Sequence, residues 1–414
     1  MTRCRLPLLG LALTVLGAGA CDWTAFDDLA LKAPIRAVPR PDDMDSNLYP
    51  TFVLPVTKQP SGRGSAELLV LGRDNVALAD LTFGPDGHLG TQTITNDRFV
   101  LNGAKVGPLG VAAYLPDPAS EVPRIVAVLE EERQPILVTL DSTDASFSVA
   151  TLGAALTIEV GAITVGDARV AGETDVVIAS GKQLIVLPTA LAPLAESCDL
   201  ESAVAALAVG DQWIVAGQSQ NGRAWLVKPD YAAAPDELCA NRTELLDHSE
   251  AFAFGTVVMA ADIDDDGTRD IAVSAPQERT IYFYSADDGA RKGDAKTLAG
   301  ATTGCGTTMA VGTLEEQRTL VIGDPGDPGG VAAPGVVWLQ SLADLTADPQ
   351  RLDRPTDDVQ RFGQQVGVVT FTGPAGPVDL LWVAAEAVTQ GDPGVVYLYF
   401  WVQDPASDPR AFQD

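Results

Sequence analysis

One pattern of short apolar runs recurs from about residue 47 to the end of the chain. Each unit has three runs rich in Val, Ile and Leu, separated by turn residues, and the third run often carries an aromatic residue. A clear example is the unit that contains Gly161–Val165, Asp175–Ala179 and Leu184–Leu187. Long segments with the 3.6-residue period of an amphipathic helix are absent from the sequence. The pattern therefore predicts an all-β chain.

Seven such units lie near residues 50–80, 105–142, 156–190, 198–230, 248–289, 300–342 and 358–402. Their spacing of about 40–60 residues is typical of four-stranded propeller blades. A sheet this small cannot bury both of its faces alone, whereas sheets stacked in a ring can. We therefore expect residues 47–414 to form a single β-propeller domain with seven blades, each a four-stranded antiparallel sheet. Six or eight blades remain open, because the first two units are the least regular.

The fifth unit contains a loop with aspartates at alternating positions, Asp262-Ile-Asp-Asp-Asp-Gly-Thr-Arg-Asp270. Counted from Asp262, carboxylates stand at positions 1, 3, 5 and 9, and a glycine stands at position 6. Calcium prefers six to eight oxygen ligands, and this spacing can direct several of them at one centre. An EF-hand would have a glutamate at position 12, but Val273 stands there within an apolar run. The loop is therefore expected to join two strands.

The predicted Ca²⁺ ligands are four side chains and one backbone carbonyl, those of Asp262, Asp264, Asp266 and Asp270 and that of Thr268. Four carboxylates this close together would repel one another without a cation. The alternative is a hairpin turn without metal, since Asp and Gly are common turn residues. We expect one structural calcium site.

The residues around this loop resemble one FG-GAP repeat, the blade unit of the integrin alpha-chain propeller and of many bacterial surface proteins. Phe254-Gly255 precedes an apolar strand, the aspartate loop follows, and then come Ile271–Pro276 and the aromatic run Thr280–Tyr284. The resemblance covers residues 252–284 and implies a propeller blade that holds calcium in its loop. It also implies an interaction domain, since most FG-GAP propellers are of that kind.

The third unit carries an altered copy of the same loop. Asp167, Gly172 and Asp175 occupy positions 1, 6 and 9, but Arg169 and Ala171 occupy positions 3 and 5. With an arginine inside it, this loop is not expected to bind calcium. The corresponding segments of the sixth and seventh units have lost the ligand pattern, so one calcium site is expected.

The first 20 residues have the composition of a secretory signal, with Arg3 and Arg5 before an apolar stretch that is too short to span a membrane. The small residues before Cys21 resemble the bacterial lipobox, although Ala18 stands where that motif usually has leucine. We expect a lipid on Cys21 and a Pro- and Asp-rich tether over residues 21–46, with ordinary signal cleavage as the alternative. The expected location is the cell envelope, at the outer membrane or cell surface, with the leaflet left open.

The net charge limits the possible partners, and the cysteines suggest one disulfide bond. A formal net charge of −29 argues against binding to nucleic acid or to anionic lipid, so membrane contact is expected only through the lipid anchor. Cys198 and Cys239 lie in similar loop contexts and are the preferred disulfide pair in an oxidising compartment. Cys305, in the sequence Gly-Cys-Gly, occupies the place of the Phe-Gly pair and is expected to be a small buried thiol.

No catalytic motif is found: the sequence has no His-Glu-x-x-His, no Gly-x-Ser-x-Gly and no phosphate-binding loop. The expected function is a non-catalytic binding or adhesion module of the cell envelope, monomeric, with an unidentified protein or glycan ligand. Two alternatives remain, a scaffold subunit of an envelope complex and a hydrolase or lyase that acts on polysaccharide.

Overall fold

The computed structural model describes most of the chain from residue 35 to residue 402. The described residues are 35–38, 52–57, 66–71, 75–83, 89–95, 100–101, 104–105, 109–115, 124–141, 146–169, 171–188, 196–229, 238–245, 253–315, 317–326, 334–357, 359–373, 376–387 and 394–402. The predicted signal, Cys21 and most of the predicted tether lie outside them. Among the described residues, no helix is both long and apolar enough to cross a bilayer.

The described residues form seven four-stranded antiparallel sheets and one small two-stranded sheet. The first four-stranded sheet is β2 (Phe52–Thr57), β3 (Ala66–Leu71), β4 (Asn75–Phe83) and β5 (Leu89–Thr95). The small sheet is β6 (Val100–Leu101) and β7 (Ala104–Lys105). The next is β8 (Leu109–Leu115), β9 (Arg124–Leu129), β10 (Pro135–Asp141) and β11 (Ser146–Thr151). Then come β12 (Val160–Gly166), β13 (Asp175–Ser180), β14 (Gln183–Pro188) and β15 (Glu196–Asp199).

The chain continues around the ring in the same way. The following sheet is β16 (Ala206–Val209), β17 (Ile214–Gln218), β18 (Arg223–Val227) and β19 (Arg242–Glu244), with the short 3-10 helix η4 (Ser219–Asn221) between β17 and β18. Next are β20 (Val258–Ala261), β21 (Asp270–Ala275), β22 (Thr280–Tyr284) and β23 (Lys296–Thr297), with η6 (Pro276–Glu278) between β21 and β22. After them come β24 (Thr308–Leu314), β25 (Gln317–Asp324), β26 (Val336–Ser341) and β27 (Gln350–Asp353). The last three long strands are β28 (Val359–Gly373), β29 (Gly376–Ala387) and β30 (Val395–Val402).

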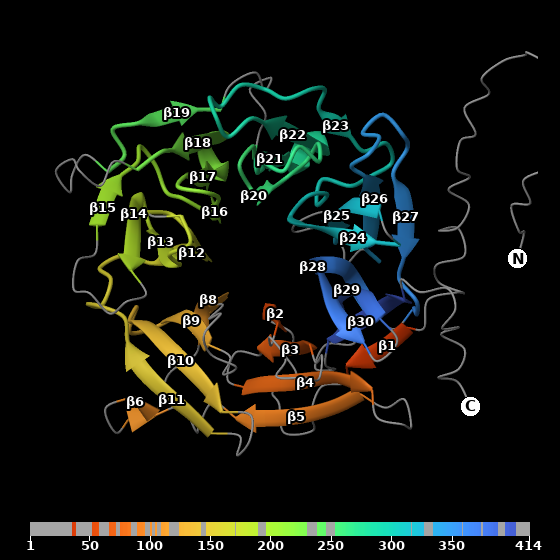
Figure 1. The fold of residues 1–414 in the computed structure, drawn as a ribbon, viewed down its shortest axis with the longest axis horizontal. Coiled ribbons are helices and arrows are strands. Elements are labelled where there is room, and N and C mark those ends of the chain that lie inside the picture. Colours follow the sequence, from red (N-terminus) through yellow and green to blue (C-terminus); the bar gives the residue numbers. More distant parts are fainter. Residues whose placement is uncertain are drawn as a thin grey trace, which may run out of the picture.

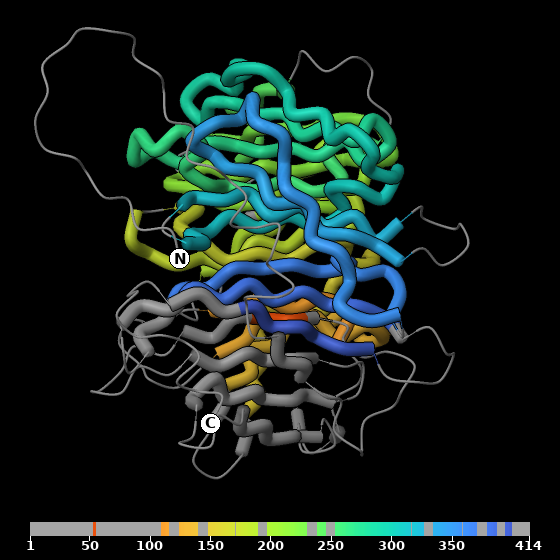
Figure 2. The backbone as a smooth tube through the Cα atoms, turned by 90° about the vertical axis from the view of Figure 1, so that its right-hand side faces the viewer, coloured from red at the N-terminus to blue at the C-terminus, as the bar shows by residue number. Residues whose placement is uncertain are grey.

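The sheets stand side by side around a central opening, and the strands nearest the centre are β2, β8, β12, β16, β20, β24 and β28 (Figure 1). Seen from the side, the strands of successive sheets stack along the ring (Figure 2). The predicted all-β propeller of four-stranded antiparallel sheets is confirmed.

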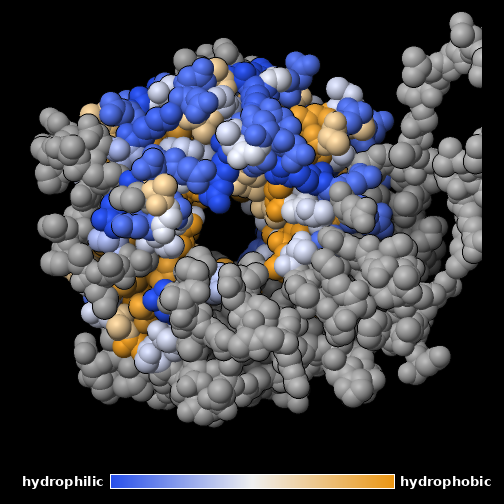
Figure 3. Space-filling model, in the orientation of Figure 1, coloured by the Kyte–Doolittle hydropathy of each residue, from blue (hydrophilic) through white to orange (hydrophobic). Residues whose placement is uncertain are grey.

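The burial of the strands explains why their residues are mostly apolar. The second strands β13, β17 and β21 are buried along their whole length, because neighbouring sheets cover both faces. The innermost strands are less covered: Met259 and Met309 are half-buried. Hydrophobic residues also line the central opening on the face that Figure 3 shows. The apolar core therefore consists of layers between neighbouring sheets, as the repeat pattern predicts.

The last sheet takes its outermost strand from the beginning of the chain. Strand β1 (Ile35–Val38) pairs antiparallel with β30, with Ile35 opposite Tyr399. This corrects the predicted domain boundary, because residues 35–38 fall in the segment that was expected to be a tether. The prediction failed because an outer strand of four residues beside several prolines has no alternating pattern. The pairing joins both ends of the domain in one sheet and closes the ring.

Three glycines at equivalent positions bring neighbouring sheets close together. Gly255, Gly306 and Gly363 all have positive φ, +84°, +81° and +89°. A Cβ on Gly255 would come within 2.4 Å of the Arg223 carbonyl oxygen in the preceding sheet. A side chain would therefore clash at this contact, which only glycine permits. Cys305 precedes Gly306 as Phe254 precedes Gly255. The structure therefore places Cys305 at the position of the Phe-Gly pair, as the repeat pattern predicts.

Candidate metal centre

The aspartate loop joins β20 to β21 at the point where Ala261 pairs with Asp270. Two residues with left-handed backbone conformation turn the chain, Asp265 at φ +63° and Gly267 at φ +85°. The Gly267 amide donates to Asp262 Oδ2 at 3.1 Å, and this hydrogen bond links the sixth residue of the loop to the first. The loop is thus a tight turn closed by its own first side chain, as the spacing of Asp and Gly predicts.

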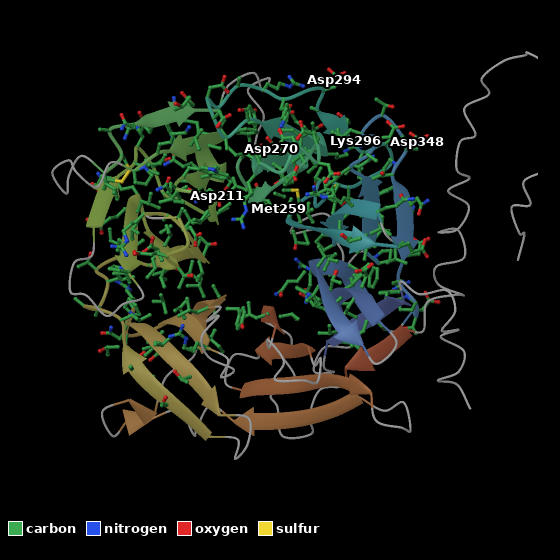
Figure 4. The ribbon with its side chains drawn as sticks, viewed as in Figure 1. Asp211, Met259, Asp270, Asp294, Lys296 and Asp348 are labelled. Carbon is green, nitrogen blue, oxygen red and sulfur yellow. A yellow bond between two sulfur atoms is a disulfide. The ribbon has the colours of Figure 1, made fainter. Side chains whose placement is uncertain are left out.

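The structure brings three of the predicted ligands together. One carboxylate oxygen each from Asp262, Asp264 and Asp270 lies within 4.8 Å of the others. Asp270, which Figure 4 labels in the sheet β20–β23, has a side chain that is only 3 % exposed, whereas that of Asp264 is 47 % exposed. The cluster therefore has a buried end on β21 and an open end toward solvent.

Asp266 and Thr268 are less clearly part of this cluster. The amide and the hydroxyl of Thr268 both donate to Asp266 Oδ1, at 2.7 and 2.5 Å. Asp266 Oδ2 still faces the cluster, 3.6 Å from the ammonium nitrogen described next. Asp266 thus directs one oxygen toward Lys292 at the centre of the loop, while its other oxygen holds the turn.

A lysine that the sequence did not single out lies at the centre of the loop. Lys292 is on the connection between β22 and β23, and its Nζ lies 2.7 Å from Asp264 Oδ2. The same nitrogen lies 2.8 and 3.0 Å from the two oxygens of Asp270. One ammonium group therefore offsets part of the negative charge of the cluster from within.

An arginine from the neighbouring sheet holds the outer side of the loop. Arg318, on β25, contacts Asp262 Oδ2 at 2.9 Å and Asp265 Oδ1 at 2.8 Å through Nη1. Its Nη2 donates to the backbone carbonyl of Asp262. The loop is therefore fastened to two sheets, because its own strands belong to one and Arg318 to the next.

The electrostatics follow from these contacts. Burial raises the pKa of the Asp270 carboxyl, and the hydrogen bonds from Lys292 and the Ile263 amide offset only part of that rise. Burial also raises the pKa of Asp262, but hydrogen bonds from Arg318 and Gly267 outweigh it and hold the pKa below its ordinary value. For Lys292, burial lowers the pKa, whereas the hydrogen bonds and charges of its aspartates raise it above the usual value by more. The charge balance of the loop therefore depends on a cation at its centre.

The residues fit a hard divalent cation. Asp262 Oδ1 is buried and has no hydrogen-bond partner among the described residues, although Oδ2 of the same side chain has two. An unpaired buried carboxylate oxygen is costly unless a ligand uses it. The clustered carboxylates of Asp262, Asp264 and Asp270 offer oxygen atoms, the ligands that Ca²⁺ prefers.

The altered loop of the third unit contains its own cation, the side chain of Arg169. The Arg169 Nε donates to Asp175 Oδ1 at 2.6 Å, and the Arg169 amide donates to Asp175 Oδ2 at 2.9 Å. Gly172 has φ +81° and donates to Asp167 Oδ2 at 2.8 Å, which repeats the contact between Gly267 and Asp262. The two loops thus share the contact from the glycine to the first aspartate, and in this one the arginine at position 3 holds the buried carboxylate of position 9.

The cysteines lie away from this centre. Cys198 on β15 and Cys239, just before β19, form a disulfide with Cα atoms 5.8 Å apart (Figure 4). This pair is the one preferred from the sequence. Cys305 is a buried free thiol, and burial raises the pKa of that thiol. Its environment is that of a core residue.

Comparisons with known proteins agree with the site and the fold. Residues 254–291 match the model of the FG-GAP repeat, a segment that contains Phe254-Gly255, the aspartate loop and Arg291 just before Lys292. A search of curated proteins finds no match.

Among solved structures, a chain of the structure titled "Apo ctPRC2 in an autoinhibited state" is similar, with a TM-score of 0.55 and 12 % sequence identity. The similarity covers 90 % of this chain and 98 % of that chain. At this identity it indicates the fold alone. The β-propeller of this protein therefore carries an FG-GAP repeat at residues 254–291, and the aspartate loop lies within that repeat.

Proposed function

We propose that this protein is a non-catalytic binding module, built on a β-propeller in which each four-stranded sheet is one blade and one blade is stabilised by Ca²⁺. The observation that carries the proposal is the aspartate loop within the matched FG-GAP repeat. Three carboxylates converge there, and one buried oxygen of Asp262 lacks a partner in the described part of the chain. Propellers with such repeats are mostly adhesion or scaffold domains, which favours a binding role.

In this proposal the bound ion would be held by Asp262, Asp264, Asp266 and Asp270, with the Thr268 carbonyl as a further ligand. Its chemistry would be structural: a divalent charge that offsets the repulsion of these carboxylates and fixes the loop. Because Arg318 ties the same loop to the next sheet, a fixed loop would also fix the contact between two blades. The surface near the loop would then present a constant shape to a protein or glycan ligand.

We also propose that the protein is attached to the cell envelope by a lipid on Cys21 and otherwise does not contact the membrane. The small residues before Cys21 and the strongly acidic chain support this proposal. Detergent extraction of the native host, followed by co-purification, would separate the two binding roles. Recovery alone would favour a free adhesion module, and recovery with a constant set of membrane proteins would favour a scaffold subunit.

Calcium is expected to raise the stability of the purified protein. A ligand that binds only the folded state stabilises it by RT ln(1 + [L]/Kd), which is about 2.7 kcal/mol at a hundredfold excess over Kd. Thermal unfolding in excess CaCl₂ should therefore occur at a higher temperature than unfolding in excess chelator. Replacing both Asp264 and Asp266 by alanine, which removes both oxygen ligands, should abolish the difference.

The matched control for this experiment is Asp265→Ala, which removes a carboxylate from the same loop. Asp265 stands at an even position, and its side chain is 82 % exposed. This variant should keep the calcium-dependent shift. Equal unfolding temperatures of the wild type in CaCl₂ and in chelator, at every calcium concentration tested, would show that the loop is a turn without metal.

A further inference from the structure

The ammonium of Lys292 lies where a metal ion in the aspartate loop would have to lie. Its distances to Asp264 and Asp270 oxygens, 2.7 to 3.0 Å, are only slightly longer than the 2.3–2.6 Å typical of Ca²⁺–oxygen contacts. Two cations cannot share that space, and each would repel the other. Calcium can therefore enter only if Lys292 leaves.

The Lys292 side chain can leave the loop while its backbone stays in place, because its contacts with the loop are made by the ammonium group. Its amide donates to the Phe283 carbonyl at 2.8 Å, which anchors the residue beside β22. The side chain is 29 % exposed, so it reaches the loop from the solvent side. A lysine has a flexible four-carbon stem, and its ammonium group can return to water by rotation about side-chain bonds. No backbone rearrangement is needed for the exchange.

Arg318 does not compete with the ion in the same way. It binds Asp262 through Oδ2 and through the backbone carbonyl, and it leaves Oδ1 of that side chain without a partner. Its other contact is with the exposed Asp265, outside the cluster. Arg318 can therefore stay in place when calcium binds, and Lys292 is the group that has to move.

The third-unit loop provides an internal comparison. There the cation is Arg169, a residue of the loop itself, and both its side chain and its amide bind Asp175. That cation is therefore part of the loop, and its backbone stays bound to Asp175 beside its side chain. In the fifth unit the cation comes from a separate connection, 22 residues after Asp270 in the chain.

We infer that Lys292 is an intramolecular competitor for calcium, which offsets part of the charge of the aspartate loop in the absence of the ion and swings out to solvent when the ion binds. This inference rests on the proposed calcium site. Lys292 therefore sets the calcium affinity of the site. It also keeps the loop folded at low calcium, because the carboxylates do not face one another unpaired.

The first test is calorimetric titration of CaCl₂ into the full chain, as wild type, as Lys292→Met and as Lys182→Met. Lys182 is the matched control: it forms an exposed ion pair with Asp199 in another sheet, and its loss changes the net charge equally. Removing Lys292 removes both the competitor and a positive charge next to the ion, so the apparent Kd should fall by about tenfold or more. The Kd of Lys182→Met should stay within about twofold of the wild type, because exposed and distant charges are screened.

The second test uses the wild type alone and does not depend on the folding of a variant. Acetic anhydride modifies exposed amines, and mass spectrometry of peptides measures the extent at Lys292 and Lys182. Calcium should increase modification of Lys292 several-fold over chelator and leave Lys182 unchanged.

The results of these tests distinguish the calcium site itself from the competitor role of Lys292. Calcium binding with the same Kd in the wild type and Lys292→Met, and no change in Lys292 modification, would leave the site intact and overturn the competitor role. No calcium binding by any of the three proteins would overturn the site itself, and the inference with it.

Discussion

Replacing Phe254 by alanine is expected to lower the free energy of unfolding by about 3–5 kcal/mol, the usual cost of deleting a buried phenylalanine side chain. Phe254 is 0 % exposed and makes edge contacts with Tyr282 and Tyr284, at ring-centroid distances of 5.6 and 6.2 Å. It belongs to a cluster that also contains Trp213 and Leu226 of the preceding sheet. The resulting cavity would therefore lie between two blades. Urea denaturation of the wild type and the variant measures the difference.

Phe254→Leu is the matched control, because it keeps most of the volume. Its cost should stay below about 1.5 kcal/mol, as for other hydrophobic substitutions of similar size. The equivalent position in the next unit holds the smaller Cys305, packed in a cluster with Phe283 and Trp338. Neighbouring side chains can therefore fill this position when the sequence provides for it. A loss below 1 kcal/mol for Phe254→Ala would mean that the two sheets close over the cavity, against the prediction.

Removing the disulfide is expected to cost about 3–4 kcal/mol. Cys198 and Cys239 are 41 residues apart in the chain, and in the loop-entropy model a cross-link over this length restricts the unfolded chain by that amount. The bond connects β15 of one sheet to the segment just before β19 in the next. Cys198→Ser/Cys239→Ser should therefore unfold at lower urea than the oxidised wild type.

The wild type in the presence of a reductant serves as the internal control. It should unfold close to the double variant, whereas the double variant itself should not respond to reductant. Cys305→Ala tests the free thiol: it should not abolish the difference between oxidised and reduced protein. If the oxidised and reduced wild types unfold at the same urea concentration, the bond does not stabilise the domain.

The sequence is enough to predict the features that depend only on residues close together in the chain. The alternating aspartates and Gly267 indicate the tight turn, because side-chain spacing and positive φ act within a few residues. The altered loop at Asp167–Asp175 is recognisable for the same reason, and the structure gives both loops the same contact from glycine to the first aspartate. The position of Cys305 follows from the repeat, since each unit places its residues in the same order.

Features that depend on distant parts of the chain could not be predicted in this way. Lys292 reaches the loop from the connection after β22, and Arg318 reaches it from another sheet, so no local spacing connects them with the aspartates. The fourth strands are equally hard to find, because β23 has only two residues and β15 and β27 have four. Without these strands the sequence shows three runs in each unit instead of four. A lysine near an FG-GAP loop is a signal that could be sought in other sequences.

The pairing of β1 with β30 has a consequence for biosynthesis. About 360 residues separate Ile35 from Tyr399, so β1 leaves the ribosome long before the strand with which it pairs. At a translation rate of about 5–20 residues per second, this delay is on the order of 20–70 seconds. During that time the growing chain is an open arc with unpaired edges, at which a chaperone could bind or another nascent chain could pair. The arrival of β30 would end this period of exposure in a single step.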